Sequence, residues 1–319
     1  MKSAGLHKLY VVSSRVFTSG LVVAAIWTLV SQRDIFLNLN SLGLSLFVVV
    51  VFHLGVQVSA FASTLFFRRR GFAALFSTQL SLNYRSHMAN FVTPSAIGSA
   101  LKLKRFASRH SPGHALWYLI QERLFSFFWF AILGLIATLV SGGVAIGQNL
   151  YQVLIWSFGG CVVLSLVFGG LLPFVFKSIE GRLPRRVFNV TAGIPNFKEA
   201  VTTDGVQIIA YSTLILTGLG AGTALAVGFV LWPSDPTLFL LARVVAALIS
   251  LVPLPIPGLA TRELGSIGLL LLLGAPASMA ALASSIYIFG IVTGAIVGVV
   301  YELLMLLRKR EDKKFVEGV

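Results

Sequence analysis

Long apolar runs separated by short polar segments dominate the chain. Because the hydrocarbon core of a membrane is about 30 Å thick, a helix of about 20 apolar residues can cross it. Runs of this kind occupy residues 11–30, 42–67, 115–140, 150–175, 206–231 and 276–307. The first run is longer than a signal-peptide core, so we expect a retained helix. The pattern predicts an all-α, polytopic membrane protein with a single transmembrane domain over residues 1–319.

Two further apolar stretches, 71–108 and 238–273, do not fit a simple spanning pattern. Each is interrupted near its middle, by "NFVTPSAIGSALK" (90–102) and by "LVPLPIPGLATREL" (251–264). Irregular backbone at membrane depth is tolerated where protein or a wet cavity covers it, so both stretches are predicted to be broken, re-entrant pairs of half-helices. The residues expected at the breaks and half-helix ends, where caps and prolines start helices, are Thr93, Pro94, Gly98, Pro255, Pro257 and Gly258.

The two interruptions also align with each other at an offset of 160 residues. Residues 91–102 fall on residues 251–262 without a gap, so that Gly98 meets Gly258 and Lys102 meets Arg262. The predicted spans on either side of the two breaks run in opposite directions. This arrangement predicts an inverted repeat, with a first half at 1–145 and a second at 146–319. Such repeats place a binding site at the midplane between discontinuous helices.

Charge is scarce and unevenly distributed. The chain is 56% hydrophobic and 11% charged, with a formal net charge of +14. The loops 31–41, 141–149 and 232–237 contain a single basic residue, Arg33. The other basic residues gather on the opposite side, in segments that include "RRR" (68–70), residues 102–109, residues 177–198 and "RKREDKK" (308–314). Because basic loops stay inside, we expect both termini to be cytoplasmic, and the charge requires no nucleic-acid partner.

Ionisable residues inside membrane segments are the candidates for a binding site. They are the basic Lys102, Arg123, Arg243 and Arg262, with the acidic Glu122 and Glu263. Each new half-helix N-terminus offers unpaired N–H groups and a positive dipole end, which suit an anion such as phosphate. Under this hypothesis the carboxylates orient the arginines and limit the positive charge. The alternative is that the prolines only end helices and that Arg262 and Glu263 pair with each other or with neighbours for structural reasons.

Three segments carry a resemblance to a known family. "MANFVTPSAIGSALKLKRFA", "QERLFSFFWFAILGLIA" and "PLPIPGLATRELGSIGLLLLLGAP" resemble the lysylphosphatidylglycerol synthase transmembrane-region family, the flippase-like membrane half of the multiple peptide resistance factor. The matching positions are Pro94, Gly98, Lys102, Glu122, Arg123, Pro255, Gly258, Arg262 and Glu263. Pro257 and Leu259-Ala260 depart from the glycine-rich stretch of the family. The resemblance covers about residues 10–307 and implies lipid binding and translocation by a stand-alone member, which we expect in a bacterial or archaeal cytoplasmic (inner) membrane.

These observations predict a lipid flippase, a non-enzymatic transporter that moves an anionic phospholipid or lipid-linked phosphate between leaflets. One alternative is a lipid-modifying transferase, but the two deep acidic residues both adjoin an arginine, which favours ionised carboxylates over poised acids. The other is a scaffold that recruits envelope-biosynthesis proteins. No cofactor or metal is expected, because Cys161 is the only cysteine and the chain has no G-x-x-x-x-G-K-[ST] loop.

Overall fold

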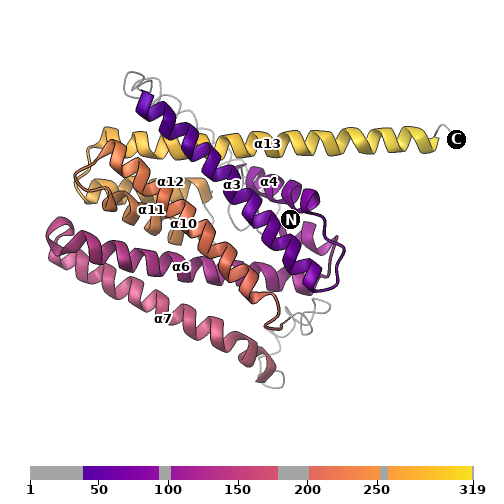
Figure 1. Cartoon of the computed structure of the whole chain (residues 1–319), viewed down its shortest axis with the longest axis horizontal. Coiled ribbons are helices and arrows are strands. Elements are labelled where there is room, and N and C mark those ends of the chain that lie inside the picture. Colours follow the sequence, from indigo (N-terminus) through magenta and orange to yellow (C-terminus); the bar gives the residue numbers. More distant parts are fainter. Residues whose placement is uncertain (1–38, 93–101, 179–200, 252–257, 318–319) are drawn as a thin grey trace, which may run out of the picture.

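The protein is a bundle of long helices (Figure 1). The computed structural model describes residues 39–92, 102–178, 201–251 and 258–317, and no strand occurs among them. The helices are α3 (Leu39–Arg69), α4 (Phe76–Val92), α6 (Pro112–Ile146), α7 (Gln148–Ser178), α10 (Val206–Leu231), α11 (Thr237–Leu251), α12 (Gly258–Leu272) and α13 (Ala277–Glu317). A shorter helical segment covers residues 102–107.

Five of these helices, α3, α6, α7, α10 and α13, are long and apolar enough to cross a membrane. They coincide with five of the predicted spans, so the all-α polytopic fold is confirmed for the described part of the chain. The remaining predicted span, 11–30, lies outside the described residues. Low amphipathicity is expected of such helices, because one side faces lipid and the other faces apolar neighbours.

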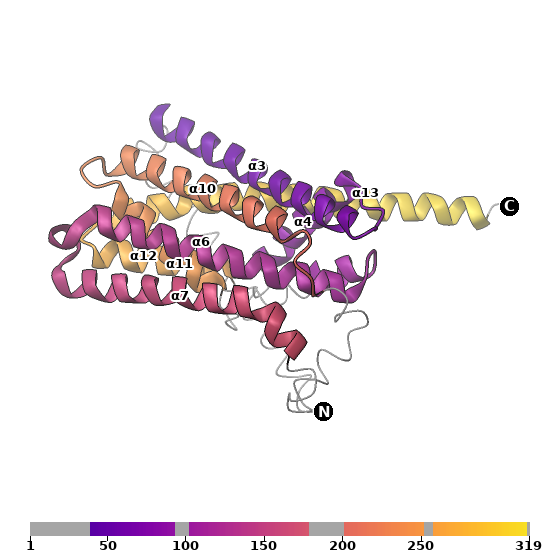
Figure 2. The ribbon, with the colours of Figure 1, turned by 60° about the horizontal axis from the view of Figure 1, so that its bottom comes forward.

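The two interrupted stretches form helices that are too short to span. Helix α4 has 17 residues, and α11 and α12 have 15 each, against about 20 for a spanning helix. Figures 1 and 2 show that α4 begins at the end of the bundle where α3 finishes, whereas α11 begins at the opposite end, where α10 finishes. Helices α4 and α11 therefore enter the bundle from opposite ends.

The connections at the two ends differ in charge. Arg68–Arg70 and residues 102–109, with their basic side chains, lie at the end where α6 and α10 begin, which we name the basic end. The turns that join α6 to α7, α10 to α11 and α12 to α13 lie at the other end and contain no basic residue. The described loops are thus sorted by charge as the sequence predicted.

Packing between the helices follows a reciprocal pattern. Helix α4 packs on α13 while α11 packs on α6; α3 packs on α4 while α10 packs on α11; and α3 contacts α13 while α10 contacts α6. Each of these contacts has a counterpart when α3 is exchanged with α10, α4 with α11, and α6 with α13. Helices α3 and α10 are themselves neighbours, so they form the contact between the two sets.

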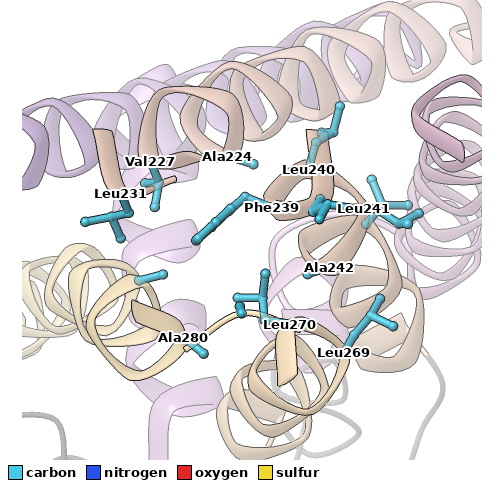
Figure 3. Close-up of a cluster of buried hydrophobic side chains, with 14 of the residues drawn as sticks. Ala224, Val227, Leu231, Phe239, Leu240, Leu241, Ala242, Leu269, Leu270 and Ala280 are labelled. Atoms are coloured by element: carbon cyan, nitrogen blue, oxygen red, sulfur yellow. The ribbon is translucent and has the colours of Figure 1, made fainter. Parts of the chain in front are cut away.

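Two clusters of buried apolar side chains hold the bundle together. The larger draws mainly on α10, α11, α12 and α13, with contributions from α3, α6 and α7. Figure 3 shows Phe239 of α11 between Val227 of α10 and Leu270 of α12. The second lies at the basic end and is rich in aromatic rings. There His110 stacks on Phe67 with ring centroids 4.0 Å apart. Burial, followed by the charge of Arg109, lowers the pKa of His110 to about 4, so the ring is neutral in this cluster.

Small residues let α13 approach its neighbours closely. Gly290 and Gly294 face Val48 and Phe52 of α3, and Gly298 faces the backbone of Tyr84 on α4. Glycines four residues apart lie on one face of a helix, and small residues in this spacing allow close contact between membrane helices. The glycine face therefore positions α4, which carries part of the site described below.

We expect the substitution Gly298→Ala to lower the free energy of unfolding by about 1–3 kcal/mol, the usual cost of overpacking. An added Cβ at Gly298 would lie 2.6 Å from the carbonyl oxygen of Tyr84, which cannot move without shifting α4. Thermal unfolding in detergent measures the effect. Gly218→Ala is the matched control, because no atom lies within 4 Å of its new Cβ. Equal melting temperatures for the two variants would contradict this prediction.

Candidate functional site

A cavity of about 750 Å³, partly open to the outside of the bundle, lies between the two sets of helices. Its wall takes side chains from α3, α4, α6, α10, α11, α12 and α13 and from the segment 102–107. Most of the wall is apolar. Its polar and charged side chains are Ser59, Asn83, Ser86, His87, Lys102, Glu122, Arg123, Ser126, Thr223, Arg243, Arg262 and Tyr287.

All four predicted basic residues line this cavity. Lys102 and Arg123 come from the first half of the chain, and Arg243 and Arg262 come from the second. Glu122 also lines the cavity, and Glu263 is buried behind Arg243 with its side chain 1% exposed. The structure therefore brings together six residues that are up to 161 positions apart in the sequence. The assignment of roles to these residues remains a prediction.

Glu122 binds Lys102 and a chain of polar side chains. The Lys102 Nζ donates to both carboxylate oxygens of Glu122 at 2.8 Å. The Ser59 hydroxyl lies 3.5 Å from Glu122 Oε1 and 3.2 Å from the Asn83 side-chain oxygen. The ammonium group also lies 5.6 Å from the ring centroids of both Phe106 and Tyr118. Paired, hydrogen-bonded and flanked by aromatic faces, this lysine is held in a fixed position at the wall.

Glu263 binds a basic residue on a different helix. The Arg243 Nη1 donates to Glu263 Oε1 at 2.9 Å, and the Ser284 hydroxyl donates to Oε2 at 2.8 Å. The Arg243 guanidinium lies 3.8 Å from the ring centroid of Tyr287. Glu263 thus connects α11, α12 and α13 through one buried carboxylate. Buried charges of this kind are retained when they are paired and hydrogen-bonded.

Arg262 is less tightly held than its neighbours. Its Nε lies 4.0 Å from Glu263 Oε1, at the limit of an ion pair, and its side chain is 34% exposed. The Nε has no hydrogen-bond partner among the described residues. Glu263 thus has both of the contacts that the structural alternative describes: a long ion pair with Arg262 and a short bond with its neighbour Arg243, 20 residues earlier. The choice between a binding role and a structural role for Arg262 remains a prediction.

Residues of α11 and α12 on either side of the second predicted break line the same cavity. Leu251, the last residue of α11, lines it, and Arg262 lies on the second turn of α12. Gly258, one of the predicted half-helix ends, is the first described residue of α12, and its role remains a prediction. The other predicted break residues, Thr93, Pro94, Gly98, Pro255 and Pro257, lie outside the described residues.

Sequence reasoning did not select Asn83, His87 or Tyr287 for the site. Asn83 carried a usable signal, because the 160-residue offset that aligns Lys102 with Arg262 also aligns Asn83 with Arg243. His87 lies one helical turn beyond Asn83 on α4, on the same face. Tyr287 carried no such signal, since nothing in an apolar helix distinguishes an aromatic residue that faces a cavity from one that faces lipid.

Two other polar groups link α4 to its neighbours. Arg85, on α4, forms an ion pair with Glu302 of α13, and Arg105 lies 3.8 Å from the same carboxylate. The His53 Nδ1 lies 2.7 Å from the Tyr84 hydroxyl, so His53 links α3 to α4. None of these residues lines the cavity. They attach α4 to its neighbours, as polar side chains commonly do between membrane helices.

Comparison with known protein families gives one match. Over residues 9–300 the chain matches the family described as Lysylphosphatidylglycerol synthase TM region. The matched region includes every residue that lines the cavity. No curated protein and no solved structure matches the chain.

Proposed function

The chain belongs to the lysylphosphatidylglycerol synthase TM region family, and from this membership and its cavity we propose that it moves an anionic lipid or lipid-linked phosphate between membrane leaflets. The observation that carries the proposal is the charged cavity itself. Lys102, Arg123, Arg243 and Arg262 line one internal space in a multi-pass membrane protein. Basic side chains at this depth are costly, and in transporters they mark the path of a charged substrate.

The phosphate of the lipid would occupy the cavity between the two broken helix pairs. Arginine binds phosphate through a planar, two-pronged contact, and the N-terminus of α12, beginning at Gly258, adds a positive dipole end. Glu122 and Glu263 hold Lys102 and Arg243 and so limit the net positive charge when the cavity is empty of substrate. The role of the protein in this proposal is binding and transport, without covalent chemistry.

Alternating access would follow from an inverted repeat of residues 1–145 and 146–319. The entry of α4 and α11 from opposite ends supports this organisation, as does the reciprocal packing of α3, α4 and α6 with α10, α11 and α13. In transporters built this way, one repeat rocks against the other around a fixed site at the midplane. The contact between α3 and α10 would be part of the moving boundary.

The acyl chains would leave the cavity along the same α3–α10 contact. A second, outward groove of about 520 Å³ continues along these two helices, lined by residues such as Phe61 and Leu65 of α3 and Tyr211 and Ile215 of α10. Gly55 of α3 and Leu216 of α10 both line the internal cavity and face each other at this contact. We place the lateral opening here, with the head group inside and the chains in lipid.

Translocation in reconstituted vesicles tests the proposal against its two rivals. Fluorescent anionic lipids in the outer leaflet are quenched by a membrane-impermeant reductant, so that exchange between leaflets appears as a change in the protected fraction. A transporter gives protein-dependent exchange, a lipid-modifying transferase gives a new lipid species, and a scaffold gives neither. The absence of exchange in vesicles that contain folded protein would contradict transport.

Both termini are proposed to lie in the cytoplasm, since the basic end should face inward. After Cys161→Ser removes the native cysteine, Ser108→Cys at the basic end should react with an impermeant maleimide only once cells are permeabilised. Ser234→Cys, in the exposed turn between α10 and α11, should react in intact cells. The Cys161→Ser background alone controls for other labelling. Reaction of Ser234→Cys from the cytoplasmic side alone would reverse this topology.

A further inference from the structure

Gln57 places a carboxamide on the outer surface of a membrane-spanning helix. It lies near the middle of the candidate span Leu42–Arg69 of α3, and it is exposed. No hydrogen bond joins it to another described residue, whereas His53, one turn earlier, lies 2.7 Å from the Tyr84 hydroxyl. The hydrocarbon core offers no hydrogen-bonding group, and an unsatisfied amide there is costly. Gln57 therefore needs a partner that the described residues do not supply.

Gln57 lines the outward groove between α3 and α10, whose wall is mainly apolar. The other polar residues of this wall are accounted for. The Ser212 hydroxyl donates to the carbonyl of Ile209. Tyr211 is the sixth residue of α10, close to the basic end, where tyrosine commonly meets the membrane interface. Of the described residues that line the groove, Gln57 alone is a polar group without a partner near the middle of its span.

The groove and the cavity meet at one level of the bundle. On α3, Val56 lines the cavity and Gln57 lines the groove; on the facing α10, Leu216 lines the cavity and Ile215 lines the groove. Successive residues of a helix point about 100° apart, so neighbouring positions face the two spaces at the same depth. A lipid with its head group in the cavity and its chains in the groove would cross this contact beside Gln57.

We propose that Gln57 is a specificity-determining residue that donates a hydrogen bond to an ester carbonyl of a diacyl lipid in transit. This inference rests on the proposed transport function and concerns the segment of the lipid that joins the head group to the chains. Ester groups normally lie in the hydrated interfacial region, but a head group at the midplane draws them into a region without water. The ester brings acceptors alone, and the carboxamide carries two N–H donors. Each group satisfies the other.

Ester-linked and ether-linked lipids test the inference. Fluorescent phosphatidylglycerol with two ester-linked chains is compared with its diether analogue, which has the same head group and chain length and no carbonyl. The variant is Gln57→Met, because methionine keeps the length of the side chain and removes its N–H donors. We expect the variant to move the diester about fivefold more slowly than the wild type, the factor for one neutral hydrogen bond, and the diether less than about twofold more slowly.

Equal slowing of the two lipids, or no slowing of either, overturns the inference and leaves transport standing. If folded wild-type protein moves neither lipid, the proposed function itself fails, and the inference fails with it. A fluorescent polyprenyl phosphate, which has no ester carbonyl, is the third lipid. Faster movement of this lipid than of the diester by the wild type would also overturn the inference. Rates in protein-free vesicles are subtracted throughout.

Gln152→Met is the matched control. Gln152 is an exposed glutamine of another spanning helix, α7, and it lies outside the groove. The same chemical change at this position should leave the rates of both lipids unchanged. A fivefold loss of diester movement in Gln152→Met as well would show that the effect does not belong to the groove, and would overturn the inference.

A protein segment that covers the groove is the competing explanation for Gln57. The segment would be a second copy of the chain or residues 11–30, which lie outside the described residues. In either case the carboxamide would link helices, so that Gln57→Met would lower the melting temperature in detergent and leave the ratio of diester to diether rates as in the wild type. We expect the opposite result, an unchanged melting temperature and a changed ratio. A lowered melting temperature with an unchanged ratio assigns Gln57 to helix packing and overturns the inference.

Discussion

Replacing Glu263 with leucine should destabilise the protein by about 3–5 kcal/mol, the usual cost of breaking a buried ion pair from one side. The change leaves the Arg243 guanidinium, 7% exposed, without its carboxylate, and it leaves the Ser284 hydroxyl without its acceptor. It also removes the buried polar link of α12 with α11 and α13. Thermal unfolding in detergent, supported by the yield of monodisperse protein, measures the loss.

Glu302→Leu is the matched control for this variant. Glu302 also pairs with an arginine, Arg85, but its side chain is 33% exposed at the basic end. Because one third of the Glu302 side chain is exposed and solvent screening weakens such pairs, the control should lose less stability than Glu263→Leu. If the two variants lost similar amounts of stability, breaking the buried Glu263 pair would be no more destabilising than breaking the more exposed Glu302 pair.

The double variant Arg243→Met with Glu263→Leu separates folding from function. Replacing both members of a buried pair by apolar residues of similar size is often neutral or stabilising, so most of the lost stability should return. Lipid movement should remain absent, because an arginine of the cavity wall has gone. Recovered transport together with recovered stability would show that this pair serves the fold alone.

Much of the fold could be predicted from apolar runs because a spanning helix needs only length and hydrophobicity. The runs at 42–67 and 206–231 became α3 and α10 within a few residues. The sorting of loops by charge was equally visible, since orientation depends on which segments hold lysine and arginine. Both features are local properties of the sequence, so neither required knowledge of how helices pack.

The charged residues that line the cavity could also be predicted from the sequence. Which cation pairs with which carboxylate could not. Lys102, Arg243 and Arg262 were selected because ionisable groups at membrane depth are rare. Which cation binds Glu263 depends on how α11 and α12 are rotated about their axes. Adjacent residues on a helix point about 100° apart. Arg262 therefore reaches the Glu263 carboxylate only at 4.0 Å, whereas Arg243 from the facing helix binds it at 2.9 Å. Such contacts between helices cannot be predicted from the pattern of apolar and polar residues.

Arg262→Leu should leave folding intact and remove transport. The side chain makes no close ion pair with Glu263, whose nearest oxygen is 4.0 Å from Nε, so its loss leaves no buried carboxylate unpaired. If Arg262 contacts the phosphate through two charge-assisted hydrogen bonds, each worth about 1.5–3 kcal/mol, translocation should fall by about 100-fold or more. The rate is measured with whichever anionic lipid the wild type moves, alongside thermal unfolding.

Arg262→Lys sharpens this test because lysine keeps the charge and loses the planar, two-pronged contact. A transport rate about tenfold below the wild type would mean that the charge of Arg262 and its planar geometry contribute about equally to phosphate binding. Arg69→Leu, at an exposed position of the basic end, controls for general loss of positive charge and should transport normally. Lys102 cannot replace Arg262, since both oxygens of Glu122 hold its ammonium group at 2.8 Å. Full transport by Arg262→Leu would therefore place the anion elsewhere and leave the broken helix at Gly258 as a structural feature.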